Sequence, residues 1–437
     1  MSLAEELASR LHDRPSCEGA ETSEWSFELA EGTAMRAGLA NGTLGGPYEP
    51  PGVLVGIGGW IDIRWSDGLR TLGTVDRGAV DQLEDRLASW RATAYRDGWA
   101  GPLQAPCAFP QVETHDPSAE AMVSGGPSAL FEVLGRARRA LEARGLGQIE
   151  AKVGVGSGRR WIRNSRGVQV EFPETSFALQ VSADELYSDA FSKRRVASAT
   201  EESTLIEEVA RTAAELRRDD HLPCADGPIL LAPTVVERFL GRFLGTNLGG
   251  RAVIDGHSAF AREDFVGRRL ILREDLALVV DTTLPLELAT SPCSAEGVPG
   301  GRVALIASGR LATPMADLRQ ARRGGFAPTP SPRGSPSLLL ETSEAPLELE
   351  AALARLDPGL VVYFVMGVHT QNARTSEYSV VAPQAQVVRK GVRGGKTAAR
   401  LGGNFLGQLR DPSTTFVRFP GRYNPGLLVR CDVGASG

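Results

Sequence analysis

The segment from Gly359 to Leu409 constrains the fold more than any other part of the sequence. It opens with an uninterrupted apolar run, 359–366, that is rich in valine and aromatic residues. A short run of this kind next to glycine predicts a strand buried on both faces. A polar loop follows at 367–377, and strand character returns at Tyr378. Two buried strands with a long polar loop between them are the usual support for a binding loop.

The length and charge of the chain limit what it can be. With 437 residues, it is too long for one ordinary core and predicts two or three domains. Its charged fraction of 23% and hydrophobic fraction of 42% are typical of globular proteins. The net charge of -5 gives the chain no overall electrostatic attraction to nucleic acid or to anionic membranes. We therefore expect neither as a partner.

The targeting features and the cysteines point to one compartment. No apolar run approaches the roughly 20 residues that a membrane helix needs. Residues 2–12 have the pattern of an amphipathic helix and not of a signal peptide. The cysteines are odd in number and widely spaced, which favours free thiols over a disulfide framework. These features predict a protein of the reducing cytoplasm.

The alternation of helical and strand patterns predicts an α+β protein with three parts. Residues 1–100 combine helices with an antiparallel sheet, and residues 101–127 form a linker. Residues 128–222 form a second helix-and-sheet unit, so that the N-terminal portion consists of two subdomains. Residues 223–437 form a mostly β C-terminal domain.

The individual elements follow from periodicity and from turn residues, except at 54–59, where the pattern is poorly defined. The predicted elements are a helix at 2–12, strands at 24–29, 33–39, 60–65 and 69–74, helices at 76–95 and 128–144, a hairpin over 149–164 that turns at Gly156-Ser157-Gly158, strands at 167–172 and 176–181, a helix at 200–218, a strand at 229–233, a helix at 234–244, strands at 276–280 and 302–307, and a helix at 345–356.

Several motifs of the C-terminal part resemble those of a known family. They are Gly367-Val-His-Thr-Gln-Asn, Tyr378-Ser379 and Gly403-Asn404-Phe-Leu. Together they are similar to the C-terminal signature of the TldD/TldE metalloprotease family, and most of all to its TldE (PmbA) branch. The segments 163–167 and 289–299 resemble two further turns of that family. The resemblance implies a fold shared along the whole chain.

The helix at 234–244 carries the decisive difference within this resemblance. In the TldD branch this helix contains His-Glu-x-x-x-His, in which the histidines bind zinc and the glutamate is the general base. Aligned on Gly241, the corresponding positions here are Glu237, Arg238 and Arg242. Arginine stays protonated and has no lone pair for a cation. The sequence therefore implies a branch member without the zinc motif, and we predict no catalytic and no metal-binding residues.

The distribution of histidine supports the same conclusion without the family. The five histidines are scattered, and the two nearest in sequence are His221 and His257. No pair has helical or hairpin spacing, so every short zinc-protease motif is absent from the sequence. The TldD branch also uses a later cysteine as a ligand, whereas Cys431 lies here inside the expected last strand. A metal site assembled from distant residues stays open as an alternative.

Other motifs give weaker signals. Gly154-Val-Gly-Ser-Gly-Arg departs from the dinucleotide-binding pattern at its last position, and Gly391-Val-Arg-Gly-Gly-Lys-Thr is too short between its glycines for a phosphate-binding loop. The basic residues between 389 and 400 favour a solvated face, with an interface to an acidic partner as the alternative. His221-Leu-Pro-Cys224 has metal-like spacing but no second pair nearby.

The resemblance implies a non-catalytic subunit, although whether the chain is itself an enzyme stays open. Such a subunit pairs with a zinc-bearing TldD-like chain to form a peptide-cleaving heterodimer and helps to enclose an extended peptide. Zinc is then expected in the partner and no cofactor in this chain. His369, Asn372 and Asn404 are the candidates for peptide or partner contact. The alternatives are a self-sufficient peptide hydrolase with an unrecognised site and a homodimeric peptide-binding protein.

Overall fold

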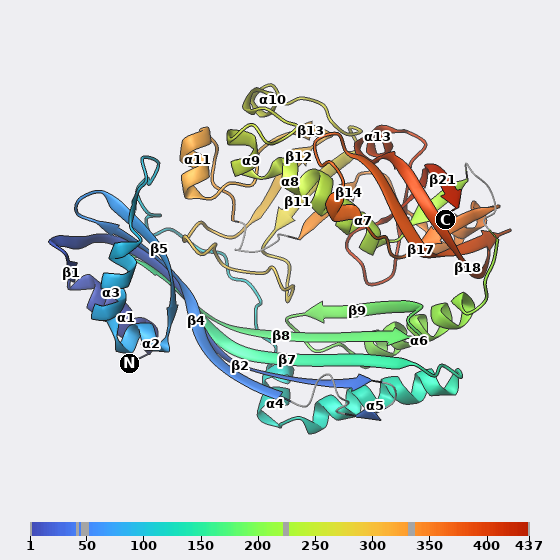
Figure 1. Cartoon of the computed structure of the whole chain (residues 1–437), viewed down its shortest axis with the longest axis horizontal. Helices are drawn as coiled ribbons and strands as arrows, with labels where there is room; N and C mark the ends of the chain where they lie inside the picture. The colour runs from blue at the N-terminus through green and yellow to red at the C-terminus, as the bar shows by residue number, and fades with distance from the viewer. Residues whose placement is uncertain (1, 41–42, 45–51, 222–226, 331–336, 436–437) are drawn as a thin grey trace.

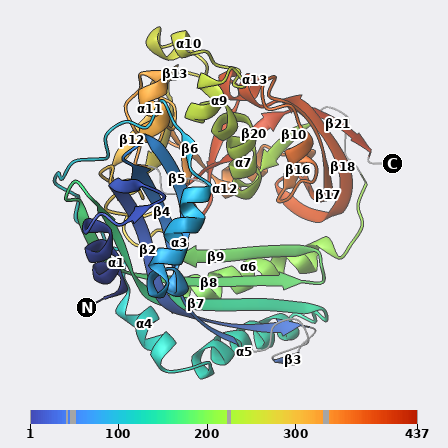
Figure 2. The same cartoon turned by 60° about the vertical axis from the view of Figure 1, so that its left-hand side comes forward.

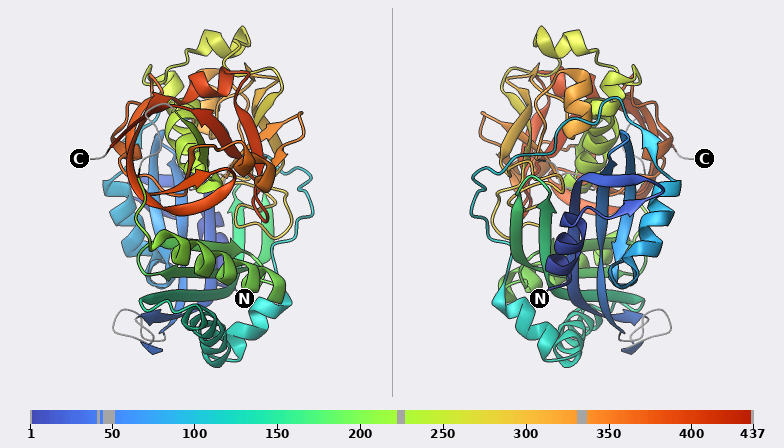
Figure 3. Two further views of the ribbon diagram at one scale, coloured as in Figure 1. Left: turned by 90° about the vertical axis from the view of Figure 1, so that its right-hand side faces the viewer. Right: turned by 90° about the vertical axis from the view of Figure 1, so that its left-hand side faces the viewer.

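A long N-terminal sheet curves beneath a C-terminal domain in the computed structural model (Figure 1). The structure describes residues 2–40, 43–44, 52–221, 227–330 and 337–435. Figures 2 and 3 show the same arrangement from three other directions. The predicted α+β class is confirmed, with an antiparallel sheet and helices at the N-terminus and a mostly β domain at the C-terminus.

The N-terminal half contains one sheet and the helices that pack on it. Its elements are α1 (Leu3–His12), β1 (Ser16–Cys17), β2 (Ala20–Ala40), β3 (Thr43–Leu44), β4 (Gly52–Trp65), β5 (Leu69–Asp76), α2 (Arg77–Asp81), α3 (Leu83–Ala92), β6 (Tyr95–Arg96), α4 (Pro117–Ser124), α5 (Ser128–Ala143), β7 (Ile149–Asn164), β8 (Gln169–Ala183), β9 (Tyr187–Lys193) and α6 (Ala199–Leu216). In the described residues the strand order is β6-β5-β4-β2-β7-β8-β9, all antiparallel, with β1 and β3 paired to β2.

The long strands correct the prediction of shorter ones. β2 is a single strand and not two, β4 continues through 54–59, and β7 runs straight through the predicted turn at Gly156–Gly158. The reason is close backbone approach at glycine. A Cβ on Gly158 would lie 2.3 Å from the carbonyl oxygen of Glu31, and a Cβ on Gly59 would lie 1.8 Å from that of Glu28. These glycines therefore mark where neighbouring strands crowd together, and not where the chain turns.

Two hydrophobic clusters lie on this one sheet, and the second includes Met35, Ala37 and Leu39 from the unit predicted over 1–100. The first joins α1, α2 and α3 to one end of β2, β4 and β5, and the second joins α5 and α6 to β7 and β8. The helix predicted at 76–95 is two helices, because Gln82 leaves helical geometry (φ -118, ψ 45). The predicted linker, 101–127, ends in α4, which Asp116 caps by accepting from the Ser118 amide at 2.9 Å.

The C-terminal half is built on two sheets. Its elements are β10 (Pro228–Leu231), α7 (Pro233–Phe239), the π-helical turn η1 (Leu240–Gly245), α8 (Thr246–Leu248), α9 (Gly250–Ile254), α10 (Arg262–Val266), β11 (Leu276–Asp281), β12 (Arg302–Ala307), β13 (Arg310–Leu311), α11 (Leu318–Gly324), β14 (Leu338–Thr342), β15 (Leu347–Glu348), α12 (Leu349–Ala354), β16 (Gly359–Val362), η2 (Val368–Thr370), β17 (Glu377–Arg389), β18 (Val392–Asn404), α13 (Phe405–Arg410), β19 (Thr415–Arg418), β20 (Gly426–Arg430) and β21 (Asp432–Ala435).

The larger C-terminal sheet has the order β15-β19-β20-β10-β16-β17-β18-β21, and the smaller has the order β13-β12-β11-β14, over the described residues. The main core lies between these sheets and α7. As predicted, the run at 359–366 begins as a strand with both faces buried, although regular pairing ends at Val362. The domain boundary predicted between 222 and 223, and Cys224 with it, lies outside the described residues.

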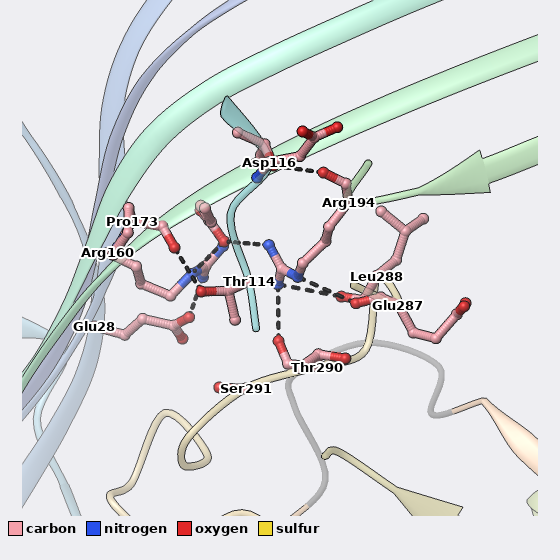
Figure 4. A network of polar contacts seen from close by, with 12 residues as sticks. Glu28, Thr114, Asp116, Arg160, Pro173, Arg194, Glu287, Leu288, Thr290 and Ser291 are labelled. Carbon is pink, nitrogen blue, oxygen red and sulfur yellow. Dashed lines mark hydrogen bonds and ion pairs between the residues drawn. The ribbon is translucent and has the colours of Figure 1, made fainter. Parts of the chain in front are cut away.

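A buried polar network joins the two halves (Figure 4). Arg194, which directly follows β9, is 8% exposed. Its guanidinium donates to three carbonyl oxygens of the C-terminal half, those of Glu287, Leu288 and Thr290, at 3.0 to 3.2 Å. It also donates to the carboxylate of Glu174 on β8 at 3.1 Å. One side chain therefore satisfies polar groups from both sides of the joint.

Glu174 carries the matching negative charge. It accepts from Arg160 at 2.9 and 3.1 Å, and Arg160 also donates to Glu28. Burial raises the pKa of the Glu174 carboxyl, but the charges and hydrogen bonds of Arg160 and Arg194 outweigh burial and hold this pKa below its usual value.

We expect this carboxylate to make the protein acid-sensitive. Because the folded pKa of Glu174 is lowered, its contribution to stability is present above the unfolded pKa of about 4.5 and is lost as the pH falls through the folded pKa. Thermal unfolding measured in buffers from pH 7 down to pH 3 should lose less stability in Glu174→Gln than in the parent. Glu171→Gln, which removes an exposed ion pair of the same strand, should keep the parental slope. An unchanged slope in Glu174→Gln would refute this assignment.

Candidate functional site

The predicted helix at 234–244 is present and contains a wider turn. α7 begins with Pro233 at its first position and continues into the π-helical turn η1 and then α8. In η1 the backbone N–H of Thr246 bonds to the carbonyl oxygen of Gly241, five residues back. Side chains five positions apart share one face only where a helix widens in this way. Glu237, Arg238 and Arg242 all lie on the outward side of the segment.

Aromatic packing on the inward side fixes the position of this segment. Phe239 and Phe243 are fully buried. The ring of Phe239 lies 4.8 Å from that of Tyr378, 5.3 Å from that of Phe405 and 5.5 Å from that of Phe243, measured between centroids. Such pairs add to the hydrophobic gain of burial. The cluster ties α7 to β17, which directly follows the polar loop at 367–377, and to α13.

The three outward side chains all have protein partners. Arg242 donates to the carbonyl oxygen of Gln371 through Nε at 3.0 Å and also through Nη2. The guanidinium of Arg238 lies over the ring of Phe364, 4.8 Å from its centroid. These contacts join the helix to the segment 364–371, so the structure brings together two regions that the sequence singled out separately.

Glu237 is the third side chain of the outward row formed by Glu237, Arg238 and Arg242. Its Oε1 accepts a hydrogen bond from Asn424 at 3.3 Å. Two of these three side chains cannot bind zinc, because Arg238 and Arg242 have only N–H groups, no free lone pair, and a positive charge. Among the described side chains, no three His, Cys, Asp or Glu gather into a group that could hold a metal ion. Arg238 and Arg242 therefore hold the segment 364–371 in place, and neither side chain can serve as a zinc ligand.

The polar loop at 367–377 is held by its own side chains as well. Gln371 donates to the carbonyl oxygen of Gly367 at 2.8 Å and bonds to both the N–H and the C=O of Ser379. Gly367 has a φ of 88°, a left-handed conformation that glycine adopts without strain. Asn247 on α8 donates to the carbonyl oxygen of Ala373 at 2.7 Å. The loop is therefore a fixed surface.

The three candidate contact residues occupy different settings on this surface. His369 is exposed, and no described residue forms a hydrogen bond or ion pair with its ring. Asn372 accepts from the Arg374 amide at 3.0 Å. Asn404 caps α13 by accepting from Gly407 at 2.8 Å and donates to Thr375 at 2.9 Å. Both asparagines therefore have local structural roles, and a contact with peptide or partner stays a prediction for all three.

A cavity of about 930 Å³ lies between the N-terminal sheet and the C-terminal domain. This volume is at the upper end of the range for ligand sites. Glu237 lines it, whereas His369, Asn372 and Asn404 are not among the described residues that do. Among the described lining residues, acidic side chains outnumber basic ones by eight to four: Asp189, Glu201, Glu208, Glu215, Glu237, Asp281, Glu287 and Glu350 against Lys193, Arg211, Arg393 and Arg422.

Sequence reasoning missed most of this wall, because its residues come from distant segments. Arg422 pairs with Asp189 and Lys193 pairs with Glu287 at 2.6 Å, each bridging the two halves. Tyr363 lies edge-on to Tyr187, with centroids 5.0 Å apart. The polar run 421–424 between two strands was the one sequence signal that could have indicated part of it.

The basic residues between 389 and 400 mostly face acids of the same chain. Arg389 pairs with Asp220 at 2.8 Å and Lys396 pairs with Asp219 at 3.1 Å, just after α6. Arg393 lies 3.7 Å from Glu208 on α6. These ion pairs form a second link between the halves. Within the part of the chain that the structure describes, no helix combines the length and apolar character needed to cross a membrane.

Comparison with known proteins finds a matching family profile and a curated relative. The profile of the PmbA/TldA metallopeptidase C-terminal domain matches residues 225–420. The uncharacterized protein MJ0231 of Methanocaldococcus jannaschii is 24% identical over 254 residues, which are 57% of this chain and 59% of the relative. The chain therefore spans about three-fifths of the length of that curated relative.

Solved structures resemble the whole chain. TldE from Thermococcus kodakarensis superposes with a TM-score of 0.80 at 16% identity and covers 100% of both chains. A proposed modulator of DNA gyrase from Thermotoga maritima gives 0.76 at 19% identity and covers 99% of this chain and 100% of its own. At these identities the likeness establishes a shared fold. The profile match assigns residues 225–420 to the PmbA/TldA metallopeptidase C-terminal domain, and the chain as a whole has the fold of the solved TldE structure.

Proposed function

We propose that this chain is the non-catalytic, TldE/PmbA-like subunit of a peptide-cleaving heterodimer. The observation that carries the proposal is the pair of bonds from Arg242 to the Gln371 carbonyl oxygen. In the TldD branch, an imidazole that binds zinc takes this position. A fixed cation here repels a metal ion, so the bond-breaking zinc belongs to a TldD-like partner.

The cavity supports the second part of the proposal. It lies beside the outward face of α7 through Glu237, and it is large enough for a segment of extended peptide. In our proposal the chain forms one wall of an enclosed chamber, and the partner supplies the zinc site. His369 on the fixed loop is the candidate for contact with the peptide or the partner subunit.

Co-expression with a TldD-like chain tests the proposal. We expect a stable complex that cleaves peptides, and we expect each chain alone to be inactive. Emission spectroscopy on this chain purified alone should find far less than one zinc ion per molecule. Chelator-sensitive cleavage by this chain alone would overturn the proposal and would favour the self-sufficient hydrolase.

A matched pair of substitutions tests the role of the cavity. Val392 lines the cavity and is 69% exposed, and Val266, on α10 and not among the described lining residues, is 77% exposed. Val392→Trp should leave the complex intact but lower its kcat/KM by about tenfold, or about 1.4 kcal/mol of transition-state binding. Val266→Trp should leave cleavage unchanged. Equal activity of the two variants would mean that peptide does not enter this cavity.

A further inference from the structure

Part of β4 is a sheet edge that has no strand partner among the residues described by the structure. β4 pairs with β2 along its whole length, but β5 covers its other side only from Gly58 to Arg64. Over the residues that the structure describes, no strand pairs with the outer edge of 52–57. Val53, Leu54 and Val55 are 62%, 73% and 72% exposed. Successive side chains of a strand point to opposite faces, so both faces are uncovered here.

The sequence of this edge is the same in both directions. It reads Gly52-Val53-Leu54-Val55-Gly56. Antiparallel pairing of two identical strands about a twofold axis needs a self-complementary segment, because residue i meets residue j and j meets i. An axis at Leu54 places each Leu54 opposite its copy and each Val53 opposite a Val55. Cross-strand pairs of branched apolar residues of this kind are favourable.

The charge pattern also permits two copies to meet. No residue from Gly52 to Ile61 is charged, so no like charges would oppose each other across the axis. Natural edge strands are commonly protected by lysine, by proline or by a covering element. The segment 52–56 contains neither lysine nor proline. A free, uncharged and self-complementary edge is therefore suited to its own copy.

We propose that two copies of this chain pair through residues 52–56 of β4 and extend the N-terminal sheet across a twofold axis. This end of β2 and the neighbouring β3 lie at the side of the sheet remote from the C-terminal domain (Figure 2). The contact therefore leaves the cavity and α7 free, and it does not depend on the heterodimer proposed above. Five paired residues bury less area than a stable interface requires, so the dimer is weak and concentration-dependent.

Cysteine cross-linking of the full chain tests the register directly. Residues directly opposite in an antiparallel pair lie about 4.5–5.5 Å apart, within disulfide range. Leu54→Cys should therefore form a covalent dimer under mild oxidation. Val53→Cys should not cross-link to itself, because its copy lies about 8 Å away, but it should cross-link when mixed with Val55→Cys. The unsubstituted protein controls for the exposed Cys107.

A charge substitution provides the second measurement. Leu54→Lys places two lysines face to face and should abolish the mass increase seen in sedimentation equilibrium at high protein concentration. Leu72→Lys adds the same charge to an exposed leucine of β5 and should leave that increase unchanged. The proposal fails if Leu54→Cys cross-links no faster than the parent, if Val53→Cys cross-links to itself equally well, or if a different protein cross-links at position 54 instead of a second copy.

Discussion

Replacing Arg194 by alanine should destabilise the protein by about 3–5 kcal/mol and should allow its two halves to unfold separately. The substitution removes four hydrogen bonds at once, three to carbonyl oxygens of the C-terminal half and one to Glu174. The carbonyl groups lose their donor at a buried joint, and Glu174 keeps only Arg160 as a charged partner.

The distribution of tryptophan makes the separation measurable. All six tryptophans lie between residues 25 and 161, in the N-terminal half. Their fluorescence therefore reports that half alone, whereas far-UV circular dichroism reports both. In the parent, the fluorescence and circular dichroism transitions should occur at the same urea concentration. In Arg194→Ala they should occur at different urea concentrations. Arg195→Ala, which removes the neighbouring ion pair with Glu201, should cost about 1 kcal/mol or less. Coincident transitions in Arg194→Ala would contradict this role of the joint.

Replacing Phe239 by alanine should cost about 3–5 kcal/mol and should act on the C-terminal half alone. Phe239 is fully buried and contacts the rings of Phe243, Tyr378 and Phe405. The truncation leaves a cavity in the cluster that holds α7 against β17, so the row of Glu237, Arg238 and Arg242 loses its support.

The same two signals distinguish this effect from a general loss of stability. In Phe239→Ala the circular dichroism signal should be lost at a lower urea concentration than in the parent. The tryptophan fluorescence should change only at a higher urea concentration than the circular dichroism. Phe364→Ala removes an exposed aromatic ring of the same region and should shift neither transition by more than a small amount. A tryptophan transition that moves together with the circular dichroism would show that the cluster does not act locally.

Periodicity predicted the helices of this fold better than its long strands. The helix at 128–144 was predicted within one residue of α5, because five buried apolar residues recur at helical spacing. The prediction of a hairpin over 149–164 was wrong. It relied on Gly156 and Gly158, because closely spaced glycines usually mark a turn, but both lie within the single strand β7. Only the pairing with β2, more than a hundred residues away in sequence, shows why glycine is needed there.

The candidate site was predicted in its parts but not in its assembly. The sequence identified the positions of Glu237, Arg238 and Arg242, and separately the loop that contains His369. The bonds from Arg242 to Gln371 join segments that are 129 residues apart, which no local pattern encodes. The cavity was not predicted, because its wall combines β9, α6 and α7 with the residues around Arg422.

Titration of this chain into a purified, zinc-bearing TldD-like subunit tests the central claim most directly. We expect peptide cleavage to rise with added chain and to level off at one chain per zinc-bearing subunit. The zinc content of the complex should match the content of that subunit alone. Cleavage that does not depend on this chain, or a tightly bound zinc ion recovered from this chain by itself, would contradict the claim.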